Sequence, residues 1–572
     1  MLYHSVVSPQ SGAYIQQLVV RLNAEDLNIE AFKQAWTSLT QRHPVLRTAF
    51  VCENIRQPLQ VVHKSAELTW TELDFRDIDR DRVAEVLTEY QDTDRLRDFD
   101  LQKPPLQRMT LIRASGDEFV WIWTRHHIIA DGWSTSILLR ELGHLYRAIT
   151  DGRTLELPPI RPYRAFISSL VPGDHSRSES FWKSYLEGMD TPLLLAELVP
   201  KPAPKRDNGE KRRLHQQKAG LISEQDTLRL KSICRDARVT LNTAVQAAWC
   251  LLLERYAGQE AITWGSTFSG RGGNLEGAEQ IVGLLINTVP LRQQVKPHQS
   301  VAEFLRAVQE NLLGVMEYEQ TSLADIQSIS PLGAGTPLFD TIVVFENYPR
   351  NASENDTLGF DRIEYREQSN LPLALIAIPG KSLELIFVHD PSVFSSSFCG
   401  KLLSELIALM AAMSADASTP VGQLPVLTRE ETNTLITFSR DSHTERDNDQ
   451  DRAHPGTTFI DIAISKRASE HPEAVAMRFL DRSVRYGELE ALSTARAVRI
   501  GEMLSAQAVD RNQCVIALHL PRSADVIVWM LAVLKAGAAY LISDPLQPLK
   551  NLERLLDSSE AVLLITDGIP TG

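Results

Sequence analysis

The chain has 572 residues, which is too long for one compact core, and this length predicts three or four domains or lobes. Its hydrophobic content of 43% is ordinary for a globular protein, while a net charge of −14 argues against nucleic acid or an anionic membrane as the main partner. The five cysteines lack metal-binding spacing, and neither a secretory leader nor an apolar run of membrane-spanning length is evident, so we expect a cytoplasmic protein with reduced thiols and no metal site.

The first clear element in chain order is an amphipathic helix. Residues 27–41 place their large apolar side chains on one helical face. Pro44 should end this helix and turn the chain into an extended segment. Arg42 and Arg47 flank that proline, in a position where arginines usually form a solvated face.

Two strands and a helix come next. Residues 106–113 and 118–124 are predicted to pair as a β-hairpin, and the second of them is an almost unbroken apolar run that suits a strand buried on both faces. From Trp133 to Ile149, apolar side chains recur with the period of a helix. Reactive groups in α/β folds commonly lie where a buried strand gives way to a helix. The stretch at that place reads His126-His127-Ile128-Ile129-Ala130-Asp131-Gly132-Trp133-Ser134.

This stretch offers acid–base chemistry. An imidazole titrates near pH 6.5 when unperturbed, so His127 is the candidate for taking up and returning a proton. His126 is expected to pack or to form a hydrogen bond rather than to react. Gly132 is expected to permit a sharp turn into the helix, and Ser134 is expected to cap its first turn. A satisfied core histidine is the alternative, but a histidine doublet followed by Asp-Gly is more specific than a lone histidine.

The carboxylate of Asp131 has its own requirement. A carboxylate buried at such a bend needs a cation or several backbone donors. Arg42 is the first choice for that cation, and Arg47 is the second.

The stretch from His126 to Gly132 matches the HHxxxDG signature of the condensation domains of nonribosomal peptide synthetases, and Trp133 and Ser134 fit the same family. The chain also resembles, more distantly, the chloramphenicol acetyltransferase-like acyltransferases. This resemblance implies an α/β fold of two chloramphenicol acetyltransferase-like lobes in a V arrangement. It also implies amide formation between donor and acceptor acyl groups, with His127 as the base.

The same resemblance implies partners and the form of the substrates. The acyl groups would be thioesters on the 4'-phosphopantetheine arms of donor and acceptor peptidyl carrier domains, with no cofactor bound covalently to this chain. The remainder of a multimodular synthetase would be a further partner.

Other segments match the family in the same order along the chain. Residues 42–50 resemble its RHExLRTxF motif, whose first arginine, Arg42 here, is implicated in pairing with the signature aspartate. Residues 281–292 resemble its GxFVNTxxxR motif, which would bring Asn287 near the substrates; a buried side chain that caps a turn is the alternative. The glycine-rich turn that starts at Ser269 follows no nucleotide-binding pattern, so it is taken as a structural turn, with Arg271 as a candidate supporting residue.

The resemblance divides the chain into four parts. Residues 1–170 would form the N-terminal lobe, with the family's first motif missing, and residues 171–436 the C-terminal lobe. Residues 437–455 are polar and charged, as in a linker. Residues 456–572 resemble the truncated start of an adenylation domain, which is expected to be too short for activity.

Two other classes of function stay open. A hydrolase-like or epimerase-type relative would share HHxxxDG, but Trp133-Ser134 and Asn287-Thr288 favour condensation. A non-catalytic platform for docking carriers, or an inactive synthetase fragment, is the alternative outside catalysis. Such platforms tend to lose the second histidine, which this chain retains as His127.

Overall fold

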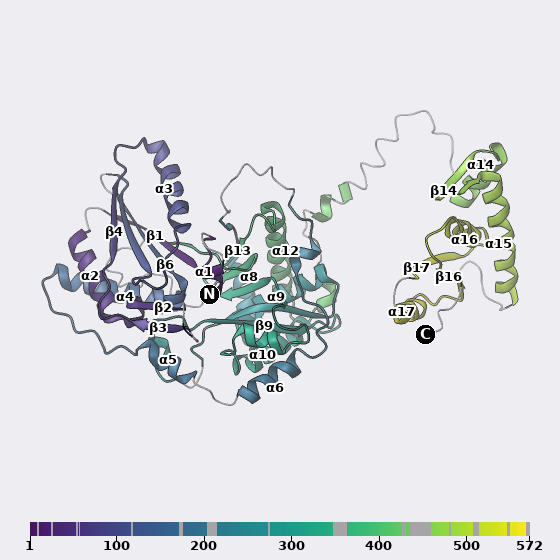
Figure 1. Ribbon diagram of the computed structural model, residues 1–572. Coiled ribbons are helices and arrows are strands. Elements are labelled where there is room, and N and C mark those ends of the chain that lie inside the picture. Colours follow the sequence, from purple (N-terminus) through teal and green to yellow (C-terminus); the bar gives the residue numbers. More distant parts are fainter. Residues whose placement is uncertain are drawn as a thin grey trace. The chain divides into compact units, whose positions relative to one another are not determined.

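The chain contains two compact units, Met1–Phe438 and Ser439–Gly572 (Figure 1). The predicted linker, residues 437–455, lies outside the described residues apart from Thr437. The computed structural model describes residues 1–7, 11–23, 27–52, 55, 58–115, 118–170, 175–202, 214–272, 275–346, 363–425, 427, 431–434, 436–437, 459–479, 482–506, 514–545 and 549–567.

The first unit contains a five-stranded sheet in the order β11-β1-β6-β5-β4. Strand β1 runs antiparallel to β11 and to β6, β6 runs antiparallel to β5, and β5 and β4 run parallel to each other. The predicted hairpin is the β5–β6 pair, and β6 is buried at every position after its first, as its apolar sequence predicts. The strands are β1 (Ile15–Asn23), β4 (Thr69–Asp74), β5 (Gln107–Arg113), β6 (Glu118–His126) and β11 (Ile363–Arg366).

Helices cover both faces of this sheet because β6 alternates its side chains between two cores. Trp121 and Trp123 pack against α2 (Ile29–Arg42) and α4 (Gly132–Thr150), whereas Val120 and Ile122 pack against α3 (Arg80–Arg95). As predicted, α2 ends just before Pro44, which begins a short 3₁₀ turn. The smaller elements of this region are α1 (Leu2–Val7), β2 (Thr48–Val51), β3 (Leu59–Val62) and α5 (Tyr163–Ser169).

The same unit contains a second sheet, which has six strands in the order β7-β13-β12-β10-β8-β9. Its strands are β7 (Gln216–Ile222), β8 (Ala261–Phe268), β9 (Asn287–Gln294), β10 (Thr341–Phe345), β12 (Leu373–Ile378) and β13 (Leu383–His389). The helices are α6 (His175–Tyr185), α7 (Leu195–Leu198), α8 (Glu224–Ala237), α9 (Leu241–Ala257), α10 (Val301–Met316), α11 (Leu323–Ile329) and α12 (Ser396–Ala415).

Within the described ranges, α12 is the one helix that is long and apolar enough to cross a membrane. Half of its apolar stretch is buried inside the unit, where Leu402, Leu406 and Met410 belong to the core of the second sheet. Such burial is typical of a core helix in a globular protein.

One strand crosses between the two sheets. β11 comes from the segment expected to form the second lobe, yet it pairs with β1, with Leu18 opposite Tyr365 and Val20 opposite Ile363. The edge strand of the first sheet, β11, therefore comes from the second half of the unit. This crossover brings the residues after β11 to the region where the reactive stretch ends β6.

The second unit is an α/β segment. Its parallel sheet has the order β17-β16-β18, and β14 and β15 form an antiparallel pair. Residues 484–489 and 534–541, which resemble the first two motifs of an adenylation domain, lie at the β15–α15 and α16–β17 junctions. The mixed α/β class predicted from the sequence is confirmed. The elements are α14 (Ile460–Glu470), β14 (Val475–Phe479), β15 (Arg482–Arg485), α15 (Tyr486–Ala506), β16 (Val515–His519), α16 (Ala524–Lys535), β17 (Ala539–Ser543), α17 (Leu549–Ser559) and β18 (Leu563–Thr566).

Candidate active site

The HHxxxDG stretch lies where the sequence predicts, between a buried strand and a helix. β6 ends at His126, a 3₁₀ turn follows, and α4 begins at Gly132 with Asp131 as its N-cap. The backbone N–H of His127 donates to the carbonyl of Tyr14 at 2.7 Å, which fixes the turn against the chain just before β1.

The hydrogen bonds of His127 define which ring nitrogen is basic. Its Nδ1 lies 2.9 Å from the carbonyl oxygen of Ala130. A carbonyl only accepts, so Nδ1 carries the proton and donates it. Nε2 therefore keeps its lone pair, and the side chain that carries it lines cavities. This is the tautomer that a general base needs.

His126 has the opposite tautomer. The backbone N–H of Ile128 donates to its Nδ1 at 3.0 Å, so Nε2 carries the proton and donates to Ser5 Oγ, also at 3.0 Å. Burial, with a smaller contribution from the nearby His127, lowers the pKa of His126 to about 3. His126 is thus a neutral, hydrogen-bonded core residue, and it cannot act as a base toward the Ser5 hydroxyl.

Asp131 is fully buried, with a dense set of donors around its carboxylate. Arg271 donates from Nη1 to Oδ2 at 2.8 Å and from Nη2 to Oδ1 at 3.1 Å. The backbone N–H groups of Ser134 and Leu285 donate at 2.8 and 3.1 Å. Burial opposes the charge, but Arg271 and Ser134 outweigh it and hold the pKa of Asp131 below its usual range.

The expectation that Arg42 or Arg47 pairs with Asp131 is wrong. Arg42 donates from Nε to Glu141 in the middle of α4 at 2.9 Å, and it also binds the Pro158 carbonyl. Arg47 donates from Nε to the Thr40 carbonyl at 3.0 Å and so satisfies the end of α2. Both arginines are therefore used by other partners near α2 and α4.

The residues that follow Asp131 tie α4 to the second half of the unit. Ser134 is not the cap of α4, because Asp131 has that role; Ser134 Oγ lies 2.7 Å from Asp131 Oδ1 and accepts from the N–H of Gly283. Trp133 donates from Nε1 to the Glu279 carbonyl at 2.9 Å. The sharp turn does not depend on a left-handed backbone at Gly132, which is simply the first residue of α4.

Asn287 serves the alternative role suggested by the sequence, and it also faces a cavity. Its amide nitrogen donates to the carbonyls of Glu319 and Thr321 at 2.7 and 2.8 Å, which secures the chain between α10 and α11. Asn287 also lines the larger of the two cavities described next.

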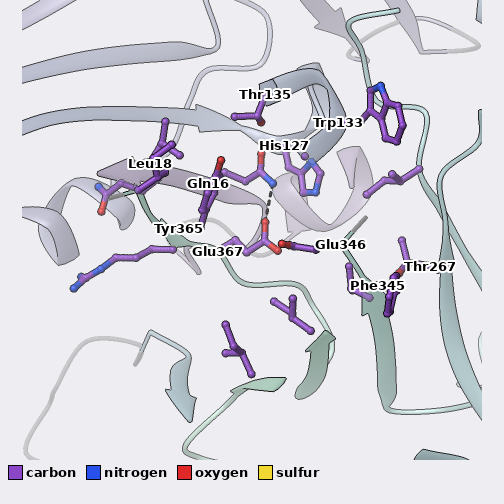
Figure 2. A pocket seen from close by; sticks show the side chains of 18 of the residues that line it. Gln16, Leu18, His127, Trp133, Thr135, Thr267, Phe345, Glu346, Tyr365 and Glu367 are labelled. Carbon is purple, nitrogen blue, oxygen red and sulfur yellow. Dashed lines mark hydrogen bonds between the residues drawn. The ribbon is translucent and has the colours of Figure 1, made fainter. Parts of the chain in front are cut away.

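Two cavities meet at His127. The smaller has a volume of about 350 Å³, and Figure 2 shows His127 among its lining side chains. The larger has a volume of about 1020 Å³. The residues that line both are His127, Thr267, Ile286, Val344 and Glu367. The His127 side chain thus lies where the two cavities adjoin.

Known proteins match nearly the whole chain in sequence. The chain is 32% identical to one subunit of the linear gramicidin synthase of Brevibacillus parabrevis over 99% of its length, and it spans 11% of that protein. It is 30% identical to surfactin synthase subunit 3 of Bacillus subtilis (strain 168) over 99% of its length, and it spans 43% of that protein. It therefore spans less than half of each of these relatives.

Solved structures share the fold at lower identity. The first condensation domain of the calcium-dependent antibiotic synthetase matches 75% of this chain and 97% of its own, with a TM-score of 0.62 and 18% identity. A holo four-domain nonribosomal peptide synthetase matches 100% of this chain and 43% of its own, with a TM-score of 0.62 and 19% identity.

Two family models also match, "Condensation domain" over residues 1–436 and "AMP-binding enzyme" over residues 464–571. The chain therefore belongs to the condensation-domain family of nonribosomal peptide synthetases, followed by the start of an AMP-binding domain.

Proposed function

We propose that this chain joins a donor acyl thioester to an acceptor aminoacyl thioester through an amide bond, the reaction of its family. The substrates would be presented on the 4'-phosphopantetheine arms of donor and acceptor carrier domains of a larger synthetase. The observation that carries this proposal is the position of His127, whose Nε2 lone pair lies where two cavities meet. In this proposal each cavity would hold one tethered substrate.

The chemistry asks little of the protein beyond positioning and one base. An α-amine titrates at about 7.7–8.0, so part of it is already free at neutral pH. The free amine attacks the donor carbonyl, and the new N–C bond makes its remaining protons acidic. His127 Nε2 takes one of them and returns it to the departing sulfur as the C–S bond breaks.

The neighbouring residues hold this base in place. The Asp131 carboxylate caps α4 and binds Arg271, and the Ala130 carbonyl between His127 and Asp131 sets the imidazole tautomer. Trp133 and Ser134 join this region to the second half of the unit, and Asn287 secures the chain between α10 and α11. In this proposal residues 1–170 and 171–436 are the two lobes of the condensation domain, and residues 456–572 are the incomplete adenylation part.

The test uses two carrier domains, each loaded with an aminoacyl thioester, mixed with the full chain. Intact-protein mass spectrometry should detect a dipeptidyl thioester on the acceptor carrier. A chain that binds both carriers but transfers no acyl group, across varied donors and acceptors, would instead be a docking platform.

A further inference from the structure

One carboxylate is shared by the two cavities. Glu367 follows directly after β11, the strand that crosses from the second half of the unit to the first sheet. Among the described residues that line the two cavities, Glu367 is the one acidic residue common to both. His127 is also common to both, so the imidazole and this carboxylate border the same two cavities. Figure 2 shows both side chains on the wall of the smaller cavity.

This carboxylate is held through one neutral group, the side-chain amide of Gln16. Gln16 donates from Nε2 to Glu367 Oε2 at 2.7 Å, and Gln16 Oε1 accepts from Arg125 Nε at 3.0 Å. Because the Arg125 guanidinium needs an acceptor, the amide of Gln16 can have only one orientation, with its NH₂ group toward Glu367. Arg125 is itself held by Thr135 and by the face of Trp123, 4.3 Å from the ring centroid.

No cation of the described chain neutralises Glu367 by direct pairing. The adjacent Arg366 is taken by Asp92 at 3.1 Å and by Glu364 at 2.7 Å. The Gln16 amide is the one hydrogen-bond donor to the Glu367 carboxylate in the part of the chain that the structure describes. A partly buried, hydrogen-bonded carboxylate without a cationic partner favours a cation brought by a ligand.

We propose that Glu367 binds the α-ammonium group of the acceptor substrate and presents its nitrogen to His127. This inference rests on the proposed condensation. Most α-amines are protonated at neutral pH, so the acceptor arrives as a cation. The cation pairs with Glu367, releases one proton to water, and attacks as the free amine. As the N–C bond forms, His127 takes the second proton, and it returns this proton to the donor sulfur when the C–S bond breaks.

The position of Glu367 favours the α-amine over a cationic side chain. The reacting nitrogen must come within reach of His127 Nε2, and Glu367 lines the region that the two cavities share with that imidazole. A cationic side chain would extend away from the reacting atoms. A carboxylate beside an ammonium group also raises the pKa of the amine. The substrate is therefore held more tightly, but a smaller fraction of its amine is free to react.

The experiment compares Glu367→Gln, Glu367→Asp and Glu364→Gln in the full chain, with carrier-bound alanyl thioester as the acceptor. Glu364→Gln is the matched control, because it makes the same change three residues earlier, where Arg366 already takes the carboxylate. Glu367→Gln should raise the KM for the alanyl carrier about ten- to a hundredfold, the usual range for a lost hydrogen bond to a charged group, and leave the donor KM unchanged. Glu367→Asp should recover part of this loss.

Two readouts separate amine binding from a structural role. The acid limb of the kcat profile should move to lower pH in Glu367→Gln, because the bound amine loses the carboxylate that favours its proton. A lactyl carrier, which has a hydroxyl in place of the amine, should bind both proteins equally. Melting temperatures are measured alongside, because the charge of Glu367 also acts on the buried Arg95.

A folded Glu367→Gln variant with an unchanged KM for the alanyl carrier and an unchanged pH profile would overturn the inference. If the wild type forms dipeptide in the same assay, the proposed condensation still stands. An effect of Glu367→Gln seen only with a lysyl acceptor would also overturn it, because Glu367 would then bind the cationic side chain of the substrate and not its α-amine. If neither the wild type nor Glu364→Gln forms dipeptide, the proposed function is wrong, and the inference about Glu367 is wrong with it.

Discussion

Arg271 and Asp131 lie 140 residues apart in the sequence, yet they form a bidentate ion pair with distances of 2.8 and 3.1 Å and almost no exposure to water. The arginine comes from the turn after β8, and the aspartate begins α4. The turn needs glycine at Gly270, where φ is +66° and a Cβ atom would lie 1.9 Å from the Leu285 carbonyl. One buried pair thus joins this turn to the segment that carries His127.

Removing either partner of this pair should destabilise the first unit. Asp131→Ala and Arg271→Ala should each cost about 3–5 kcal/mol, because each leaves a buried charge uncompensated. The double variant should cost much less than the sum of the two. Urea unfolding of the three variants provides the measurement. Arg42→Ala is the control, since its partner is Glu141, and it should be additive with Asp131→Ala.

The same pair should contribute to acid unfolding. The folded pKa of Asp131 lies below the ordinary value of 3.8, so its stabilising contribution is complete above that value. The contribution is lost as the pH falls through the lower folded pKa. Asp131→Asn should therefore show a flatter fall in unfolding free energy below pH 4 than the wild type. Identical acid slopes in both proteins would contradict this.

Glu319 should act in the opposite direction. Burial raises the pKa of this carboxyl to about 7, although the N–H of Gly270 partly offsets the shift. The folded state therefore binds more protons than the unfolded state between pH 4.5 and 7, and stability falls as the pH rises through that window. Glu319→Gln should remove this slope and be more stable at pH 8 by about 1–3 kcal/mol. Denaturation midpoints at pH 5 and pH 8 test it; an unchanged slope would rule out Glu319 as its source.

His126 and His127 should respond differently to the same substitution. His126→Ala removes two buried hydrogen bonds, so it should lower the melting temperature and the soluble yield. Its pKa of about 3 keeps the ring neutral at working pH, and the rate per folded molecule should change little. Thermal unfolding and single-turnover transfer are measured on the same preparation. A large loss of rate with an unchanged melting temperature would assign His126 to the chemistry.

The local elements around the site were predictable from the sequence because short-range patterns determine them. The apolar run before His126 has the composition of a buried strand, and the apolar period after Asp131 is that of a helix, which is how β6 and α4 form. Pro44 likewise ends α2.

The long-range contacts of the site were not predictable in the same way. The sequence indicates that Asp131 needs a cation, but not which cation packs against it. The matching motif favours Arg42, whereas the Arg42 side chain binds Glu141 on α4. Arg271 reaches the site on the turn after β8, and Glu367 reaches it because β11 pairs with β1. The local pattern of apolar residues predicts neither position.

The central claim is that Nε2 of His127 takes the proton of the attacking amine, and its most direct test is a single-turnover assay. Donor and acceptor carriers are loaded in advance with aminoacyl thioesters, and dipeptidyl thioester is quantified for the wild type and His127→Ala. Carrier binding and melting temperature are measured in parallel. We expect equal binding and a rate lower by about 10²–10⁴-fold in the variant, the usual contribution of a general base. A folded His127→Ala protein that forms the product within a few-fold of the wild-type rate would contradict the claim.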